Sequence, residues 1–359
     1  MRVLIIDDSA MMRRVLRKLI EAGDGFEVVG TANDGREGVE KTISLRPDLV
    51  TLDVEMPEMD GIDALRRITK VPSPPAVLMC STLTAEGSDT ALKALSLGAA
   101  DVIAKDPDSL SVDAGAEVRE QLLKKLKAIG EGHRRSIAAR SVAKKRGQPA
   151  GRRTAPLPTL DASKYDLVCI GSSTGGPPAL ESVLSRIPEG FPLPVVIAQH
   201  MPELFTRSLA GRLNDHCGLE VVHAESDTKL EPGMAAVIKG GKHGKVARSA
   251  GRLLLRIGDE PADALYRPSV DALLASQAEA TGARSLSIVL TGMGEDGSQG
   301  ALAVSERGGK VISQEATSCV VFGMPRAVEQ VGASDVQLTP DEIGEVLAAM
   351  TSYRRRIPA

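Results

Sequence analysis

Short apolar runs alternate with helical patterns over the first 130 residues of the chain. Five such runs predict buried strands, at residues 3–6, 28–29, 49–52, 76–79 and 102–104. Between the strands, apolar residues recur at helical spacing, as in the stripe formed by Met12, Val15, Leu16, Leu19 and Ile20. A last helix presents Val118, Leu122, Leu126 and Ile129. Five strand–helix units predict a flavodoxin-like, doubly wound parallel sheet.

A second α/β pattern begins near Tyr165 and continues to the end of the chain. Its apolar runs predict strands at residues 167–170, 195–199, 221–222, 234–238, 285–290 and 310–312, with a hairpin strand at 253–257. Helical stripes separate these strands, at residues 180–187, 204–213, 298–307 and 343–350. The second half is therefore expected to be another doubly wound α/β domain with a mainly parallel sheet.

The composition fits two soluble domains joined by a basic linker. The chain has 359 residues, 42% of them hydrophobic and 25% charged, with a net charge of −3 that gives no pointer to nucleic acid. Residues 131–163 carry many Arg and Lys residues among Ala, Gly, Ser and Pro. They are typical of a flexible linker that could be helical at its start, since a nucleic-acid-binding arm would be expected to carry aromatic residues as well. The expected domains are thus 1–130 and 164–359.

The lack of a recognisable targeting signal and the pattern of cysteines point to the cytoplasm. No apolar run reaches the roughly 18–20 residues of a membrane span. The N-terminus enters a strand directly, so no signal peptide is expected. The dispersed cysteines form no metal or redox motif and suit reduced thiols: Cys80, Cys169, Cys217 and Cys319.

Polar residues follow the predicted strands of the first half. They are Asp7, Asp8, Asp53, Ser81 and Lys105. Because the carboxyl ends of parallel strands meet at one edge of the sheet, these side chains should converge there. Three carboxylates in one place favour a bound Mg²⁺, and Lys105 with Ser81 is suited to hold a phosphoryl group. The alternative is that the acids are simply solvated and that Lys105 is a surface charge.

In these residues and their positions, the first half resembles the receiver domain of two-component response regulators. The resemblance implies that Asp53 accepts the phosphoryl group and that Asp8 and Asp53 bind Mg²⁺, with Asp7 acting through a water. The Glu55 backbone carbonyl would complete the metal ligands, and Ser81 and Lys105 would be the switch residues. The chain departs from the family in having Val102 where an aromatic residue is common and Asp106 ahead of Pro107.

A Gly-Ser-rich turn organises the second half. Residues 171–176 read Gly-Ser-Ser-Thr-Gly-Gly between a buried strand and a helix, which is the context of a nucleophile elbow centred on Ser173. A tight connection or a phosphate cradle at the helix N-terminus are the alternatives. The Rossmann spacing is not met, because Ser173 stands where its second glycine would be.

Two further strand ends supply partners for a serine nucleophile. His200 follows a buried strand, and Asp296 lies in a Gly-rich loop after another. A serine needs a base, and the base needs a carboxylate that orients it, so Ser173, His200 and Asp296 form a candidate triad. The other histidines lack such a position: His133, His216, His223 and His243. The order Ser–His–Asp differs from that of α/β-hydrolases and disfavours a lipase-like enzyme.

Five motifs in order make the second half similar to the chemotaxis receptor protein-glutamate methylesterase/glutamine deamidase family. They lie at residues 170–176, 199–202, 267–271, 290–297 and 322–325. The resemblance implies Ser173 as nucleophile, His200 as base and acid, and Asp296 as the orienting carboxylate. It also implies an oxyanion contact from the Met293 backbone N–H.

Together these resemblances imply a phosphorylation-activated hydrolase. Its substrates would be glutamate methyl esters, and glutamines, on chemoreceptors, with a histidine kinase as phosphodonor. A non-catalytic adaptor gated by the receiver domain is the alternative. A DNA-binding response regulator is disfavoured, because the second half is α/β rather than helix-turn-helix.

Overall fold

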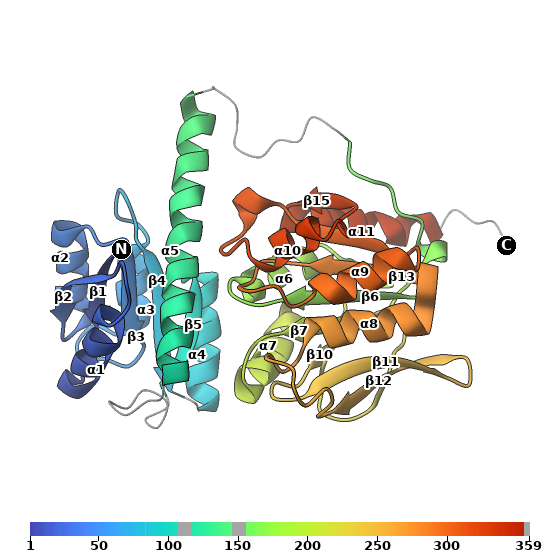
Figure 1. Cartoon of the computed structure of the whole chain (residues 1–359), viewed down its shortest axis with the longest axis horizontal. Helices are drawn as coiled ribbons and strands as arrows, with labels where there is room; N and C mark the ends of the chain where they lie inside the picture. The colour runs from blue at the N-terminus through green and yellow to red at the C-terminus, as the bar shows by residue number, and fades with distance from the viewer. Residues whose placement is uncertain (83, 106–115, 146–155, 355–359) are drawn as a thin grey trace. The chain divides into compact units, whose positions relative to one another are not determined.

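The chain divides into two units, Met1–Ala138 and Ala139–Ala359. A computed structural model describes residues 1–82, 84–105, 116–145 and 156–354. Each unit is built on its own parallel sheet (Figure 1).

The sheet of the N-terminal unit has five parallel strands in the order β2-β1-β3-β4-β5. The strands are β1 (Arg2–Ile6), β2 (Glu27–Ala32), β3 (Leu49–Asp53), β4 (Ala76–Thr82) and β5 (Asp101–Lys105). All five correspond to predicted apolar runs, and their order is that of flavodoxin-like folds. The predicted fold class of this unit is confirmed.

The helices of this unit begin at residues that suit a helix N-terminus. They are α1 (Ala10–Glu21), α2 (Gly35–Leu45), α3 (Gly61–Ile68), α4 (Ala85–Ser96) and α5 (Ala116–Lys145). The first four are capped by side-chain oxygens, those of Ser9, Asp34, Asp60 and Thr84. A Cβ at Gly61 would lie 1.9 Å from the Asp53 carbonyl oxygen, so only glycine lets α3 start this close to the end of β3.

Helix α5 is longer than the sequence pattern suggested. It continues to Lys145, so the expected domain boundary at 130 falls inside it and residues 131–145 of the expected linker are helical. Leu122, Leu126 and Ile129 are buried as predicted. The side chain of Val118 lies outside the described residues, as do residues 106–115 with Asp106 and Pro107, and the basic stretch 146–155. The linker limits therefore stay a prediction.

The sheet of the C-terminal unit has seven strands in the order β15-β14-β13-β6-β7-β10-β8, every pair parallel. They are β6 (Leu167–Ser172), β7 (Val195–Gln199), β8 (Glu220–Ala224), β10 (Met234–Ile238), β13 (Ser285–Val289), β14 (Lys310–Gln314) and β15 (Val336–Leu338). The predicted doubly wound sheet is confirmed. Strand order reverses at β6, which has β7 on one side and β13 on the other. Such a switch point is where open α/β sheets form their crevice.

A small antiparallel sheet stands beside the parallel one. It consists of β11 (His243–Ser249), β12 (Arg252–Gly258) and β9 (Thr228–Lys229), in the order β11-β12-β9. The hairpin β11–β12 contains the predicted strand at 253–257, whereas β9 and β15 were not predicted.

Two groups of helices accompany the parallel sheet. They are α6 (Gly176–Leu184), α7 (Glu203–His216) and α11 (Pro340–Arg354), and α8 (Val270–Thr281), α9 (Ser298–Glu306) and α10 (Met324–Gln330). Helix α6 contacts α7 and α11, while α9 contacts both α8 and α10. A Cβ at Gly171 would lie 2.1 Å from Val270, so this glycine lets α8 approach the end of β6.

A buried amide fixes α8 on the sheet. The side chain of Gln277 is fully buried, and its Nε2 donates to the carbonyl oxygens of Leu167 and Leu286, both at 3.1 Å. Its Oε1 accepts from Ser287 Oγ at 2.7 Å. One side chain thus ties α8 to β6 and β13.

Replacing Gln277 by Leu should lower the free energy of unfolding of the C-terminal unit by about 1–3 kcal/mol, because buried polar partners lose their hydrogen bonds. Urea unfolding of the full chain measures this. Glu279→Gln, on an exposed position of the same helix, is the control and should change stability by less than about 0.5 kcal/mol. Equal stabilities of the two variants would contradict the assignment.

Candidate active site

Ser173 lies at the turn between β6 and α6, held by both neighbouring strand ends. Its backbone N–H donates to the Thr291 carbonyl at 3.0 Å, and its own carbonyl accepts from Gln199 Nε2 at 2.9 Å and from the Gly176 N–H at 2.8 Å. Gly175 follows with a left-handed φ of +78°, the conformation that glycine adopts without strain. The turn predicted from the sequence therefore has a firmly fixed backbone.

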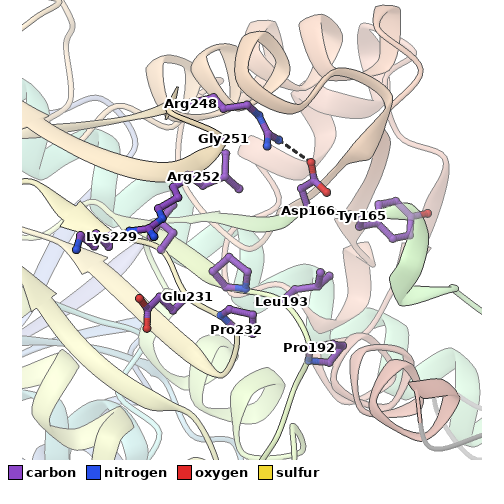
Figure 2. A pocket seen from close by; sticks show the side chains of 13 residues that line it. Tyr165, Asp166, Pro192, Leu193, Lys229, Glu231, Pro232, Arg248, Gly251 and Arg252 are labelled. Atoms are coloured by element: carbon purple, nitrogen blue, oxygen red, sulfur yellow. Dashed lines mark hydrogen bonds and ion pairs between the residues drawn. The ribbon is translucent and has the colours of Figure 1, made fainter. Parts of the chain in front are cut away.

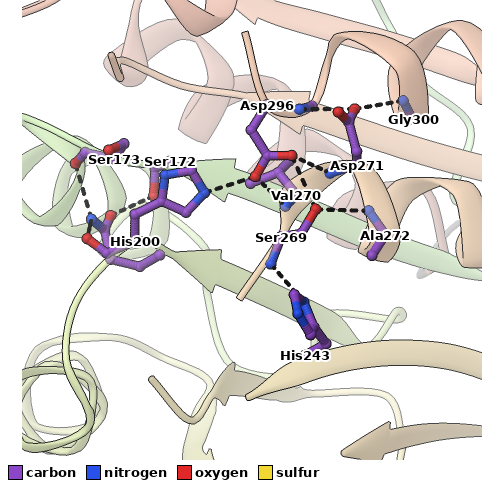
Figure 3. Close-up of polar contacts among 12 residues, drawn as sticks. Ser172, Ser173, His200, His243, Ser269, Val270, Asp271, Ala272, Asp296 and Gly300 are labelled. Carbon is purple, nitrogen blue, oxygen red and sulfur yellow. Dashed lines mark hydrogen bonds and ion pairs between the residues drawn. The ribbon is translucent and has the colours of Figure 1, made fainter. Parts of the chain in front are cut away.

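His200 and Asp296 are in direct contact. His200 follows β7, and its Nε2 lies 2.8 Å from Asp296 Oδ2 (Figure 3). Both side chains are more than nine-tenths buried, with exposures of 7% and 9%. The His200 backbone N–H also donates to the Ser172 carbonyl at 3.1 Å, so the base is anchored to the strand that carries Ser173.

The other ring nitrogen of His200 is not engaged. Nδ1 is buried and has no hydrogen-bond partner among the described residues. The structure thus pairs His200 with Asp296 and puts Ser173 on the adjacent strand end, but no hydrogen bond joins Ser173 Oγ to the imidazole within the described chain. Because Nε2 faces the carboxylate, Nδ1 is the nitrogen left to accept a proton.

The start of helix α8 cradles the Asp296 carboxylate. Oδ1 accepts from Ser269 Oγ at 3.0 Å and from the Asp271 N–H at 2.9 Å, while Oδ2 accepts from the Val270 N–H at 2.7 Å. Burial on its own would raise the pKa of Asp296. The hydrogen bond and charge of His200, with the backbone donors of Asp271 and Val270, outweigh it and lower the pKa. Asp296 is therefore ionised at neutral pH.

The carboxylate of Asp271 binds the start of helix α9 in the same way. Its Oδ1 accepts from the backbone N–H groups of Gly297 and Gly300, at 2.9 and 2.7 Å. Each of the two helices thus receives at its N-terminus a carboxylate from the neighbouring segment, an arrangement favoured by the helix dipole. Burial and the adjacent charge of Asp296 raise the pKa of Asp271 to about 6.

Tyr266 covers one face of the His200 ring. The two rings stack with centroids 4.4 Å apart and planes 10° from parallel. A Cβ at Gly294 would lie 3.2 Å from Tyr266 Oη, so the tyrosine also sits close to the Gly-rich loop. Sequence reasoning missed Tyr266, although it directly precedes one of the five motifs.

The Gly-rich loop after β13 runs beside the serine. A Cβ at Gly292 would lie 2.8 Å from the Ser173 Cβ, and the Gly292 N–H donates to the Val321 carbonyl at 3.0 Å. This closeness agrees with an oxyanion contact from the neighbouring Met293, which stays a prediction.

A separate hollow of about 640 Å³ lies at the opposite end of the sheet. Its lining includes Asp166, Leu193 and Pro232, which precede β6, β7 and β10 (Figure 2). In it Arg248 is paired with Asp166 at 2.6 Å. Ser173 and His200 follow the far ends of these strands, roughly 15–20 Å away for strands of this length. This hollow is therefore not the candidate catalytic cleft.

The predicted strand-end cluster of the N-terminal unit does form. Lys105 Nζ lies 2.8 Å from Asp7 Oδ2 and 2.6 Å from Asp53 Oδ2. Carboxylate oxygens of Asp7, Asp8 and Asp53 lie within 4.8 Å of one another, a hard donor set that fits Mg²⁺. Burial raises the pKa of Asp53 to about 6, although Lys105 acts to lower it. Hydrogen bonds to Asp53 and Asp7 in turn raise the pKa of Lys105, against the effect of burial.

The remaining predicted residues of this unit border the cluster. Ser81 is buried on β4, and its Oγ donates to the Gly87 carbonyl at 2.9 Å in the first turn of α4. The Glu55 N–H donates to Asp53 Oδ1 at 3.3 Å, so the backbone of Glu55 lies next to the Asp53 carboxylate. Val102 is buried on β5.

Comparisons with known proteins find matches for both halves of the chain. A family profile described as CheB methylesterase matches residues 168–347, and one described as response regulator receiver domain matches residues 3–113. A protein-glutamate methylesterase/protein-glutamine glutaminase of Oleidesulfovibrio alaskensis is 42% identical over 367 residues, covering 96% of this chain and 98% of the relative.

The chain belongs to the CheB methylesterase family. A Geobacter sulfurreducens protein named as a protein-glutamate methylesterase/protein-glutamine glutaminase is 41% identical, covering 98% of this chain and 97% of its own length. The crystal structure of the CheB methylesterase catalytic domain of Thermotoga maritima matches with a TM-score of 0.50 and 38% identity, over 51% of this chain and 97% of that one. The predicted family, fold class and enzyme class are confirmed.

A helix that crosses a bilayer must be both long and apolar. None of the helices in the described part of the chain meets both requirements.

Binding of Mg²⁺ to the full chain should depend on the ionisation of Asp53. Because the pKa of Asp53 is about 6, its carboxyl group is protonated in most molecules at pH 5.5 and ionised in almost all of them at pH 7.5. The Mg²⁺ dissociation constant measured by calorimetry should therefore be about fourfold higher at pH 5.5.

Asp53→Asn should weaken Mg²⁺ binding at both pH values. Asp63→Asn, which removes an exposed carboxylate paired with Arg66, should leave binding unchanged. Equal affinity at the two pH values, or wild-type affinity in Asp53→Asn, would contradict the site.

Proposed function

We propose that the chain is a phosphorylation-activated esterase that hydrolyses glutamate γ-methyl esters on chemoreceptors by a Ser–His–Asp mechanism. The 2.8 Å contact between His200 and Asp296, at the strand end next to Ser173, carries the proposal. The relatives at about 40% identity, named as methylesterases and glutaminases, support the substrate class.

The first half-reaction forms an acyl-enzyme. Ser173 Oγ attacks the γ-carbonyl carbon and gives its proton to His200 Nδ1. The oxyanion of the tetrahedral intermediate accepts a hydrogen bond from the Met293 N–H. The carbon–oxygen bond to the methoxy group then breaks, and methanol leaves with the proton from His200.

Water completes the cycle by the same steps. It attacks the acyl carbon, transfers a proton to Nδ1, and releases the glutamate carboxylate as Ser173 recovers its proton. Asp296 stays ionised throughout, because its pKa is lowered, and it stabilises the imidazolium. Glutamine would react along the same path and release ammonia in place of methanol.

The reaction requires Ser173 Oγ to come within hydrogen-bonding distance of His200 Nδ1. Ser173 Oγ must turn toward Nδ1, by rotation about its side-chain bond, and catalytic hydrogen bonds are often completed only when substrate binds. The buried and unengaged Nδ1 supports this step, since a ligand hydroxyl or Ser173 can satisfy it.

The receiver domain would supply the control. Asp53 would accept the phosphoryl group from a histidine kinase, with Asp8 and Asp53 binding Mg²⁺ directly, Asp7 through a water, and Glu55 through its carbonyl. Held by these residues, Mg²⁺ would supply positive charge that offsets the negative charge of the phosphoryl group. Lys105 would hold the transferred group, and Ser81 would turn from Gly87 toward it. Phosphorylation would then shift the population toward the active form of the esterase.

Ser173→Ala should lower methanol release by about 10³-fold or more, because it removes the hydroxyl that forms the acyl-enzyme. The assay uses membranes that contain a methylated chemoreceptor. Ser172→Ala is a matched control one residue away. It loses a buried hydrogen bond to Gln199 but should keep activity within about tenfold of wild type. Equal loss in both variants, or activity in Ser173→Ala, would rule out Ser173 as the nucleophile.

Phosphorylation should raise the esterase rate of the full chain several-fold. Acetyl phosphate with Mg²⁺ serves as phosphodonor, and Asp53→Asn should not respond to it. If the rates with and without acetyl phosphate are equal in a wild-type chain shown to be phosphorylated, the control is wrong. If methanol is never released although the chain is folded, the adaptor alternative is preferred.

A further inference from the structure

A second buried histidine stands behind the active site. His243, the first residue of β11, is 1% exposed, and its Nδ1 accepts the backbone N–H of Ser269 at 3.1 Å (Figure 3). A backbone N–H can only donate, so Nδ1 carries no proton and the ring is neutral. On the basis of the proposed function, we propose that His243 is a positioning residue that holds the catalytic carboxylate in place through Ser269.

Ser269 links His243 to Asp296, the carboxylate that contacts His200. It caps helix α8: its Oγ accepts from the Ala272 N–H at 3.2 Å and donates to Asp296 Oδ1 at 3.0 Å. The next two backbone N–H groups, of Val270 and Asp271, also bind Asp296. The bond from His243 therefore fixes the residue at which the cradle of Asp296 begins.

The surroundings of His243 favour the neutral ring. Burial lowers its pKa, and the positive charges of Arg267 ahead of α8 and Lys245 on its own strand act in the same direction. Asp296 and the Pro261 carbonyl act in the opposite direction, and Asp259 after β12 also interacts with the ring. A proton on Nδ1 would point toward the Ser269 N–H, which is also a donor, and the hydrogen bond between them would be lost.

Loss of the acceptor should affect the chemical step rather than binding. The Ser269 N–H would be left buried without its partner, and the cradle would loosen around Asp296. His200 would then be oriented less well toward Ser173. His243 contacts the cradle and not the reacting atoms, so kcat should fall while KM stays near its wild-type value.

The test compares His243→Asn with His243→Leu in the full chain. Both side chains branch at Cγ and lose part of the ring, but only Asn offers an acceptor near the Nδ1 position. His243→Asn should keep kcat within about threefold of wild type, and His243→Leu should lose about tenfold or more. His243→Phe keeps a ring without an acceptor, and its kcat should fall as much as that of His243→Leu. It replaces His243→Leu in the comparison if that variant does not fold. His216→Leu, on an exposed end of α7, is the control.

Two readouts separate this inference from the proposed function. One is methanol release from methylated receptor membranes, and the other is the rate at which a fluorophosphonate labels Ser173 in the folded chain. A wild-type chain that neither reacts with the probe nor releases methanol would refute the proposed function. If wild type does react, labelling rates that are equal in His243→Asn and His243→Leu would overturn the role of His243.

Discussion

The buried carboxylate of Asp296 is the constraint on which the catalytic unit depends. Leaving a buried carboxylate without partners costs several kcal/mol, so the fold must bring donors to it. It does so from two different segments: His200 follows β7, and the backbone of Val270 and Asp271 begins α8. The imidazole can be oriented only when these segments are in place. The orientation of the base therefore depends on how β7 and α8 pack in the folded unit.

Both units put chemistry at the carboxyl ends of parallel strands, with opposite electrostatic results. In the N-terminal unit, burial dominates and raises the pKa of Asp53 to about 6, with Asp7 adding to the effect. In the C-terminal unit, His200 and the backbone donors of α8 lower the pKa of Asp296. The first arrangement suits a site that takes up a cation and a phosphoryl group. The second suits a carboxylate that must stay charged beside an imidazole.

Much of this could be predicted from the sequence, because the relevant signals are local. Apolar runs identified the strands of both parallel sheets apart from the short β15, and they missed β9 of the small antiparallel sheet. Residues directly after the strands, such as Ser173 and His200, are polar because strand ends line the crevice. Tyr266 and His243 were missed as site residues for a different reason. Tyr266 stacks on His200 beyond the end of β7, and His243 of β11 accepts a hydrogen bond from Ser269 ahead of α8. No periodicity in the sequence records such contacts. The length of α5 was underestimated because its second half carries no apolar stripe.

For His200 to act as the base, its Nε2–H must face Asp296 while Nδ1 carries no proton. Proton and nitrogen NMR of the ¹⁵N-histidine-labelled full chain, with Asp296→Asn to assign the signal, reports which ring nitrogen is protonated. At neutral pH the proton of His200 should be on Nε2, and its ¹H resonance should lie downfield and be lost in Asp296→Asn. A proton on Nδ1, or a His200 signal indifferent to Asp296→Asn, would refute this role of His200.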